Sequence, residues 1–76
     1  MIKCSIYFVR HGEKEASKTY NSIINKKLGL TKEGNSQSRS VGSYLKSLNI
    51  DHIYSSDYRR SIDTASIAFE SRKDEI

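Results

Sequence analysis

The residues best suited to chemistry are Arg10, His11, Gly12 and Glu13, which directly follow the apolar run IYFV at residues 6–9. A neutral imidazole can attack phosphorus and carry the phosphoryl group covalently. Charge spreads over the peripheral oxygens of the transferred group in the transition state, so this nucleophile needs fixed cations beside it. The pairing of Arg10 with His11 therefore indicates phosphoryl transfer, with His11 as the nucleophile.

A second polar cluster, SSDYRRS at residues 55–61, contains the adjacent arginines Arg59 and Arg60. A guanidinium group binds phosphate oxygens in pairs and keeps its charge at every physiological pH. One of these two arginines could therefore complete a phosphate site that Arg10 begins. Ser55 and Ser56 could also bind phosphate, although a role at the start of a helix is more typical of serine.

Two residues beside His11 have alternative explanations. The missing Cβ of Gly12 lets either a phosphate or another backbone segment approach closely. Glu13 could lie in the pocket and act as a general acid, or it could be a solvated carboxylate that accepts hydrogen bonds within the loop. The sequence leaves both alternatives open.

The surrounding pattern predicts the elements that position these residues. Residues 2–9 and 50–55 are short, apolar and rich in β-branched or aromatic side chains, which predicts two strands. Residues 10–30 are polar and predict a long loop with a helical turn around residues 16–24. The periodicity of the remaining segments predicts two helices.

The first predicted helix has Thr31 as its N-cap and ends near Leu48 and Asn49. Ser56 or Asp57 is the expected cap of the second helix, which fades by Lys73. Each helix has an apolar stripe at a spacing of three and four residues, formed by Val41, Tyr44, Leu45 and Leu48 in the first and by Ile62, Ala65 and Phe69 in the second.

This order of elements predicts an α/β fold, a right-handed βαβα arrangement with two parallel strands. Ligands of such sheets lie beyond the carboxyl ends of the strands. Both polar clusters follow predicted strands, so adjacent strands would bring His11 and the arginines together.

The bulk composition limits the alternatives. The chain has 76 residues, one cysteine and a net charge of +4, which predicts at most one small domain in a reducing, cytoplasmic setting. No window approaches the length of a membrane span. The cations are spread along the chain without a stacking motif, so nucleic-acid binding is not expected.

Three stretches in register resemble the histidine phosphatase superfamily, also called phosphoglycerate mutase-like: VRHGE at residues 9–13, LGLTKEGNSQS at residues 28–38 and IYSSDYRRSIDTA at residues 53–65. The resemblance implies that His11 accepts the phosphoryl group and that Arg10 and Arg60 bind phosphate. Arg60 is chosen over Arg59 because the arginine of the family stands four positions ahead of a Thr-Ala pair. The resemblance also implies a three-layer fold, a phosphorylated small molecule or phosphoprotein as partner, and no metal or organic cofactor.

The chain departs from the family pattern in length. The second catalytic histidine and the proton-donating acid of the family have no matching positions here, and His52 is more typical of a structural or exposed strand residue. We therefore expect residues 1–76 to be the N-terminal part of a single truncated domain, nearly inactive alone and able to self-associate through exposed sheet edges. A degenerate module that binds a phosphorylated ligand or partner without turnover is the alternative. Any of Ser17, Asn21 and Asn25 could contact the substrate.

Overall fold

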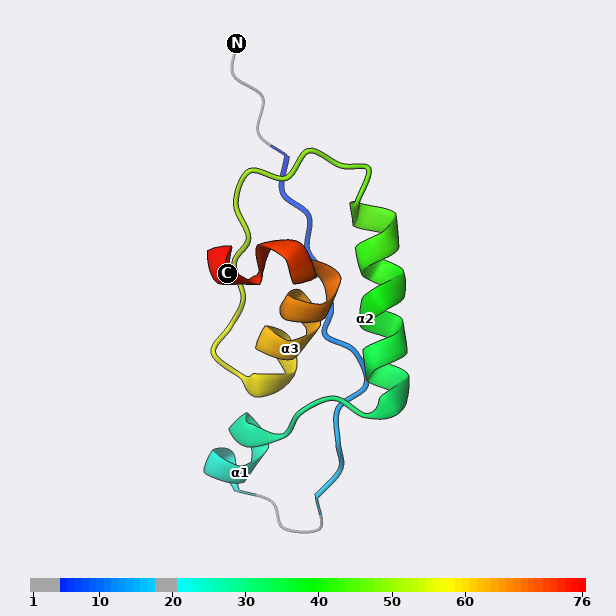
Figure 1. Cartoon of the computed structure of the whole chain (residues 1–76). Coiled ribbons are helices and arrows are strands. Elements are labelled where there is room, and N and C mark those ends of the chain that lie inside the picture. Colours follow the sequence, from blue (N-terminus) through cyan, green and yellow to red (C-terminus); the bar gives the residue numbers. More distant parts are fainter. Residues whose placement is uncertain (1–4, 18–20) are drawn as a thin grey trace.

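The fold is built from helices and extended segments. The computed structural model describes residues 5–17 and 21–76. Along these residues, α1 (Ser22–Lys27), α2 (Lys32–Leu45) and α3 (Arg59–Ala68) are followed by the 3-10 helix η1 (Glu70–Glu75). Helices α2 and α3 lie beside each other, and the chain before α1 runs past both of them (Figure 1).

Helix α2 begins where the sequence predicts. The hydroxyl of Thr31 accepts a hydrogen bond from the backbone N–H of Gly34 at 3.0 Å, which confirms the N-cap. The helix ends at Leu45, earlier than predicted, and the chain turns at residues 46–48. Leu45 is buried, but Tyr44 is 75% exposed, so the prediction of one continuous apolar stripe was wrong at Tyr44.

Helix α3 forms in the predicted region but begins differently. Its N-cap is Tyr58, which makes no side-chain capping bond, so the predicted cap at Ser56 or Asp57 was wrong. The Asp57 carboxylate instead lies 2.6 Å from the ammonium group of Lys26, at the end of α1. The buried side chain of α3 is Thr64, whereas Ile62 of the predicted stripe is 41% exposed.

The predicted α/β fold with two parallel strands was wrong for the residues that the structure describes. Their one β-bridge joins Lys14 to Leu30 in antiparallel fashion, and neither predicted strand has a partner. Residues 2–4 of the first predicted strand lie outside the described part. Residues 6–9 are all exposed, so they lack the cover on both faces that parallel strands need.

The carbonyl groups of the second predicted strand have a different partner. Arg72 of η1 donates to the backbone oxygen of Ile50 at 2.7 Å and to that of Asp51 at 3.4 Å. A side chain therefore takes the acceptors that a neighbouring strand would have used. In Figure 1, the chain that enters α3 descends along the far side of α3 from α2.

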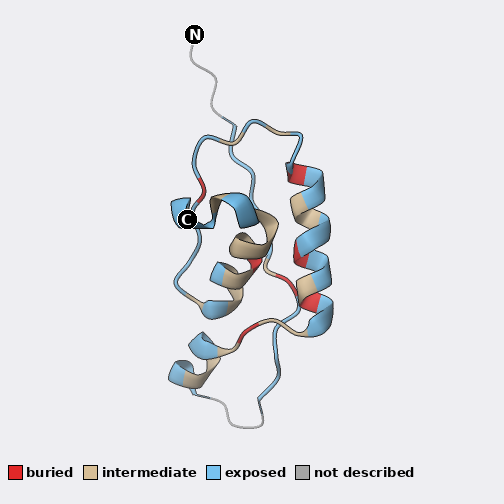
Figure 2. Ribbon diagram, viewed as in Figure 1, coloured by how far each residue is buried: buried red, intermediate tan, exposed pale blue. Residues whose placement is uncertain are grey.

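The closest packing joins α2 to the elements around it. A Cβ atom on Gly42 would lie 2.6 Å from the backbone oxygen of Ala68, so the glycine allows α2 and α3 to touch along their backbones. The buried positions of α2 and α3 lie on the sides of these helices that face each other (Figure 2). In the described part, Leu45 and Ile53 are the buried hydrophobic residues, while Ser38 and Thr64 are buried polar residues.

Candidate active site

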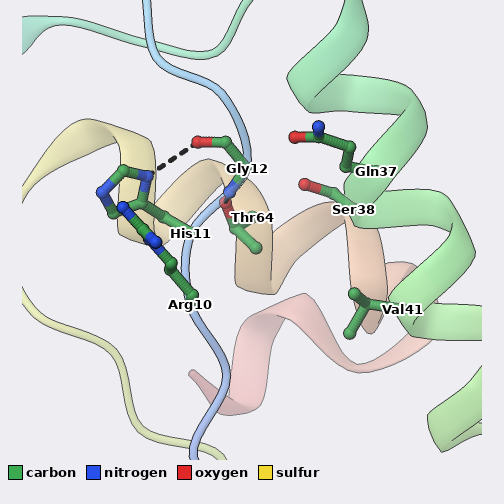
Figure 3. A pocket seen from close by; sticks show the side chains of 7 residues that line it. All are labelled: Arg10, His11, Gly12, Gln37, Ser38, Val41 and Thr64. Atoms are coloured by element: carbon green, nitrogen blue, oxygen red, sulfur yellow. Dashed lines mark hydrogen bonds between the residues drawn. The ribbon is translucent and has the colours of Figure 1, made fainter.

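A cavity of about 190 Å³ lies where the loop after residues 6–9 meets α2 and α3. Figure 3 shows the Arg10 and His11 side chains on the same side of the loop, with other lining residues projecting from α2 and α3. The lining residues are Arg10, His11, Gly12, Gln37, Ser38, Val41 and Thr64. Three of the predicted site residues, Arg10, His11 and Gly12, thus line one cavity with residues of α2 and α3.

The imidazole of His11 has a defined tautomer in this arrangement. Its Nδ1 lies 2.7 Å from the carbonyl oxygen of Gly12. A carbonyl oxygen has no proton to give, so Nδ1 must be the donor. In a neutral ring the proton on Nδ1 leaves the lone pair on Nε2. The half-buried His11, in its neutral form, therefore carries its free lone pair on Nε2.

Gly12 is held between the two long helices. Its backbone N–H donates to the hydroxyl of Thr64 in α3 at 3.1 Å. A Cβ atom on Gly12 would lie 2.5 Å from the backbone oxygen of Gly34 in α2. Of the two explanations for this glycine, the structure supports close approach to a backbone segment.

The buried hydroxyl groups that line the cavity have partners. Thr64 donates to the backbone oxygen of Arg60 at 2.7 Å while it accepts from Gly12. Ser38 donates to the backbone oxygen of Gly34 at 2.8 Å. Because burying an unpaired hydroxyl is costly, these bonds let polar side chains occupy the floor of the site.

Sequence reasoning had assigned no role in the site to Gln37, Ser38, Val41 and Thr64. One signal was available in the spacing of Gly34, Ser38 and Gly42, which are four residues apart. Residues at this spacing share one face of a helix, and a face of small residues lets other segments approach closely. Thr64 belongs to the Thr-Ala pair that located Arg60, but its own hydrogen bonds were not expected.

Glu13 binds the start of α2 and is not among the residues that line the cavity. Its carboxylate accepts from the Thr31 hydroxyl at 3.0 Å, and its backbone oxygen accepts from the Thr31 N–H at 2.9 Å. Its own N–H donates to the side-chain oxygen of Gln37 at 2.8 Å. A carboxylate is also favoured near the positive end of a helix. The structure therefore places Glu13 as a hydrogen-bond acceptor that attaches the loop to α2.

The two arginines of the second cluster have different partners. The Arg59 guanidinium lies 3.4 Å from the Asp63 carboxylate. Arg60 is not among the cavity-lining residues, and its Nη1 donates to the backbone oxygen of Asn25 at 3.0 Å and to its side-chain oxygen at 3.2 Å. The Arg60 guanidinium also lies 4.6 Å from the centre of the Tyr58 ring.

The three loop residues proposed as substrate contacts lie in different places. Asn21 caps α1, because its side-chain oxygen accepts from the N–H of Ile24 at 2.8 Å. Asn25 binds Arg60, and Ser17 is exposed. None of the three is among the residues that line the cavity.

An ion pair attaches α1 to the segment before α3. The hydrogen bond from Lys26 lowers the pKa of Asp57 below its usual value, and the same bond raises the pKa of Lys26. Both groups are exposed to solvent, so water and salt screen most of their attraction. The ion pair therefore contributes more to the orientation of α1 relative to α3 than to the stability of the fold.

The described residues contain no group of three or more His, Cys, Asp or Glu side chains that could hold a metal ion. Within the same residues, no helix has both the length and the apolar character needed to cross a membrane.

The comparison with protein families assigns the chain to a class. The model of the histidine phosphatase superfamily, branch 1, matches residues 6–76, so the chain belongs to this superfamily. The matched range includes every residue that lines the cavity. Searches among curated proteins and among solved structures found no match.

Proposed function

We propose that this chain contributes to phosphoryl transfer from phosphomonoesters through a phosphohistidine at His11. Membership of the histidine phosphatase superfamily supports a phosphatase-like or mutase-like role. The observation that carries the proposal is the 2.7 Å contact between Nδ1 of His11 and the Gly12 carbonyl, which leaves the Nε2 lone pair available. Arg10 lines the same cavity and supplies a cation beside the nucleophile.

In this proposal, the Nε2 lone pair forms an N–P bond while the ester P–O bond breaks. The leaving oxygen keeps the electron pair of the broken bond and takes up a proton from water or an acid. Water then attacks the phosphohistidine in a phosphatase, whereas a second substrate hydroxyl attacks it in a mutase. The positive charges of Arg10 and Arg60 offset the charge that develops on the phosphoryl oxygens. The substrate class is a phosphorylated small molecule or a phosphoprotein.

A non-catalytic module that binds a phosphorylated ligand is the second candidate. It is favoured by the position of the other histidine of the chain, because His52 is exposed and does not line the cavity. The His52 ring lies 6.3 Å from that of Tyr54, and no acid lines the cavity either. For these reasons we expect slow turnover by the 76 residues alone.

The test measures covalent labelling by a radiolabelled phosphomonoester. We expect an acid-labile label on the protein that is lost in His11→Ala and kept in His52→Ala, the matched control. A label that persists in His11→Ala would overturn the phosphohistidine proposal. No label at all, together with a rise in melting temperature when vanadate or inorganic phosphate is added, would instead support the binding module.

A further inference from the structure

The guanidinium of Arg60 is anchored along part of its edge. In the described part of the structure, its hydrogen bonds use Nη1 alone, at 3.0 Å and 3.2 Å from the two oxygens of Asn25. The Tyr58 ring lies against the same guanidinium, with its centre 4.6 Å away. These contacts leave Nε and Nη2 for another acceptor. Two neighbouring N–H groups of a guanidinium can bind two oxygens of one phosphate.

The position of Arg60 in α3 relates this edge to the cavity. Arg60 lies four residues before Thr64, and the two are joined by the 2.7 Å bond from the Thr64 hydroxyl to the Arg60 backbone. Residues at this spacing share a helix face. Thr64 lines the cavity, and Arg60 lies one turn N-terminal to it on the same face, beside the lining residues but not among them.

The chemistry of the anchoring groups distinguishes Arg60 from Arg59. Asp63 is negative and offsets the charge of Arg59. The amide and carbonyl oxygens of Asn25 are neutral, so they orient Arg60 without neutralising it. A guanidinium that is oriented and still fully charged suits a dianionic ligand.

We infer that Asn25 is a positioning residue for Arg60, holding one edge of its guanidinium so that the other edge can bind the substrate phosphate. The inference rests on the proposed function. The pair of Lys26 and Asp57, at 2.6 Å, holds α1 against the start of α3 and so keeps Asn25 near Arg60. On this inference, Asn25 contributes to phosphate affinity without touching the substrate.

The experiment measures the affinity of the protein for vanadate and for inorganic phosphate by titration calorimetry. We expect Asn25→Ala to weaken binding about threefold to tenfold, because one of two anchoring bonds to a charged donor is lost. Asn25→Asp should weaken binding further, since a carboxylate competes with the anion for the guanidinium. The controls Ser22→Ala and Ser22→Asp introduce the same two residues at an exposed position of α1. They should leave the affinity close to that of the wild type.

A double-mutant cycle with Arg60→Ala separates positioning from a general structural effect. If Asn25 acts through Arg60, Asn25→Ala should cause no further loss of affinity in the Arg60→Ala background. Asn25→Asp keeps an acceptor oxygen, so it tests the inference even if Asn25→Ala fails to fold. Circular dichroism checks the fold of each variant.

The outcomes distinguish this inference from the proposed function. Unchanged affinity in Asn25→Ala and Asn25→Asp, or the same loss with and without Arg60, would overturn the role of Asn25 and leave His11 labelling unaffected. A wild-type protein that binds neither anion would overturn both proposals.

Discussion

The loop at Gly12 and the apolar segment at residues 6–9 adjoin in sequence but differ in how they are held. Gly12 is buried against α2 and α3 and donates a hydrogen bond to Thr64. Phe8 is 93% exposed, and Ile6 is 71% exposed. The chain therefore changes from an uncovered segment to a buried glycine within four residues.

The contrast shows which contacts define the site. Large apolar side chains usually form the core and polar ones the surface. Around the cavity, the buried positions are instead filled by the glycines Gly12 and Gly34 and by the hydroxyl groups of Ser38 and Thr64. Backbone contact and hydrogen bonds thus place His11, while the apolar segment before it contributes little to its position.

The largest effect is expected from Gly34→Ala. A Cβ atom at this position would overlap the backbone oxygen of Glu13, and backbone atoms on both sides have little freedom to move. We expect the free energy of unfolding to fall by about 3 kcal/mol, measured by urea denaturation. Gly29→Ala is the control, because its Cβ would lie 3.1 Å from the flexible Arg59 side chain. Equal losses of stability in the two variants would show that the close packing of the loop against α2 does not depend on the missing Cβ of Gly34.

A smaller effect is expected from Thr64→Val, which keeps the shape of the side chain but removes the hydroxyl. The buried N–H of Gly12 would lose its acceptor, at a cost of about 1–3 kcal/mol. Hydrogen exchange at the Gly12 amide should speed up, as seen by NMR, and Thr64→Ser should restore its protection. If exchange is unchanged in Thr64→Val, the bond does not hold the loop.

The smallest effect is expected in the apolar segment. Phe8→Ser should change the free energy of unfolding by no more than about 0.5 kcal/mol, since the ring is already 93% exposed. Leu45→Ala, at a position 5% exposed, should cost about 2 kcal/mol in the same denaturation experiment. A large loss of stability in Phe8→Ser would mean that residues 6–9 are covered in solution. The difference in burial between this segment and Gly12 would then disappear.

Helix positions could be predicted from the sequence because they depend on local chemistry. Thr31 caps α2 as predicted, since an N-cap needs only a hydroxyl and a nearby free amide. The prediction failed for the strands, because a strand requires a partner that local sequence does not supply. The prediction of the α3 cap failed for a related reason, because Asp57 forms an ion pair with Lys26 from a distant part of the chain.

The sequence by itself determined the types of group present in the candidate site and the family to which the chain belongs, because both depend on residue identity and spacing. Tertiary structure decided how these groups are held. The hydrogen bond from Gly12 to Thr64 attaches the loop that carries His11 to α3 without a sheet. The tautomer of His11 and the anchoring of Arg60 by Asn25 likewise depend on contacts that the folded backbone creates.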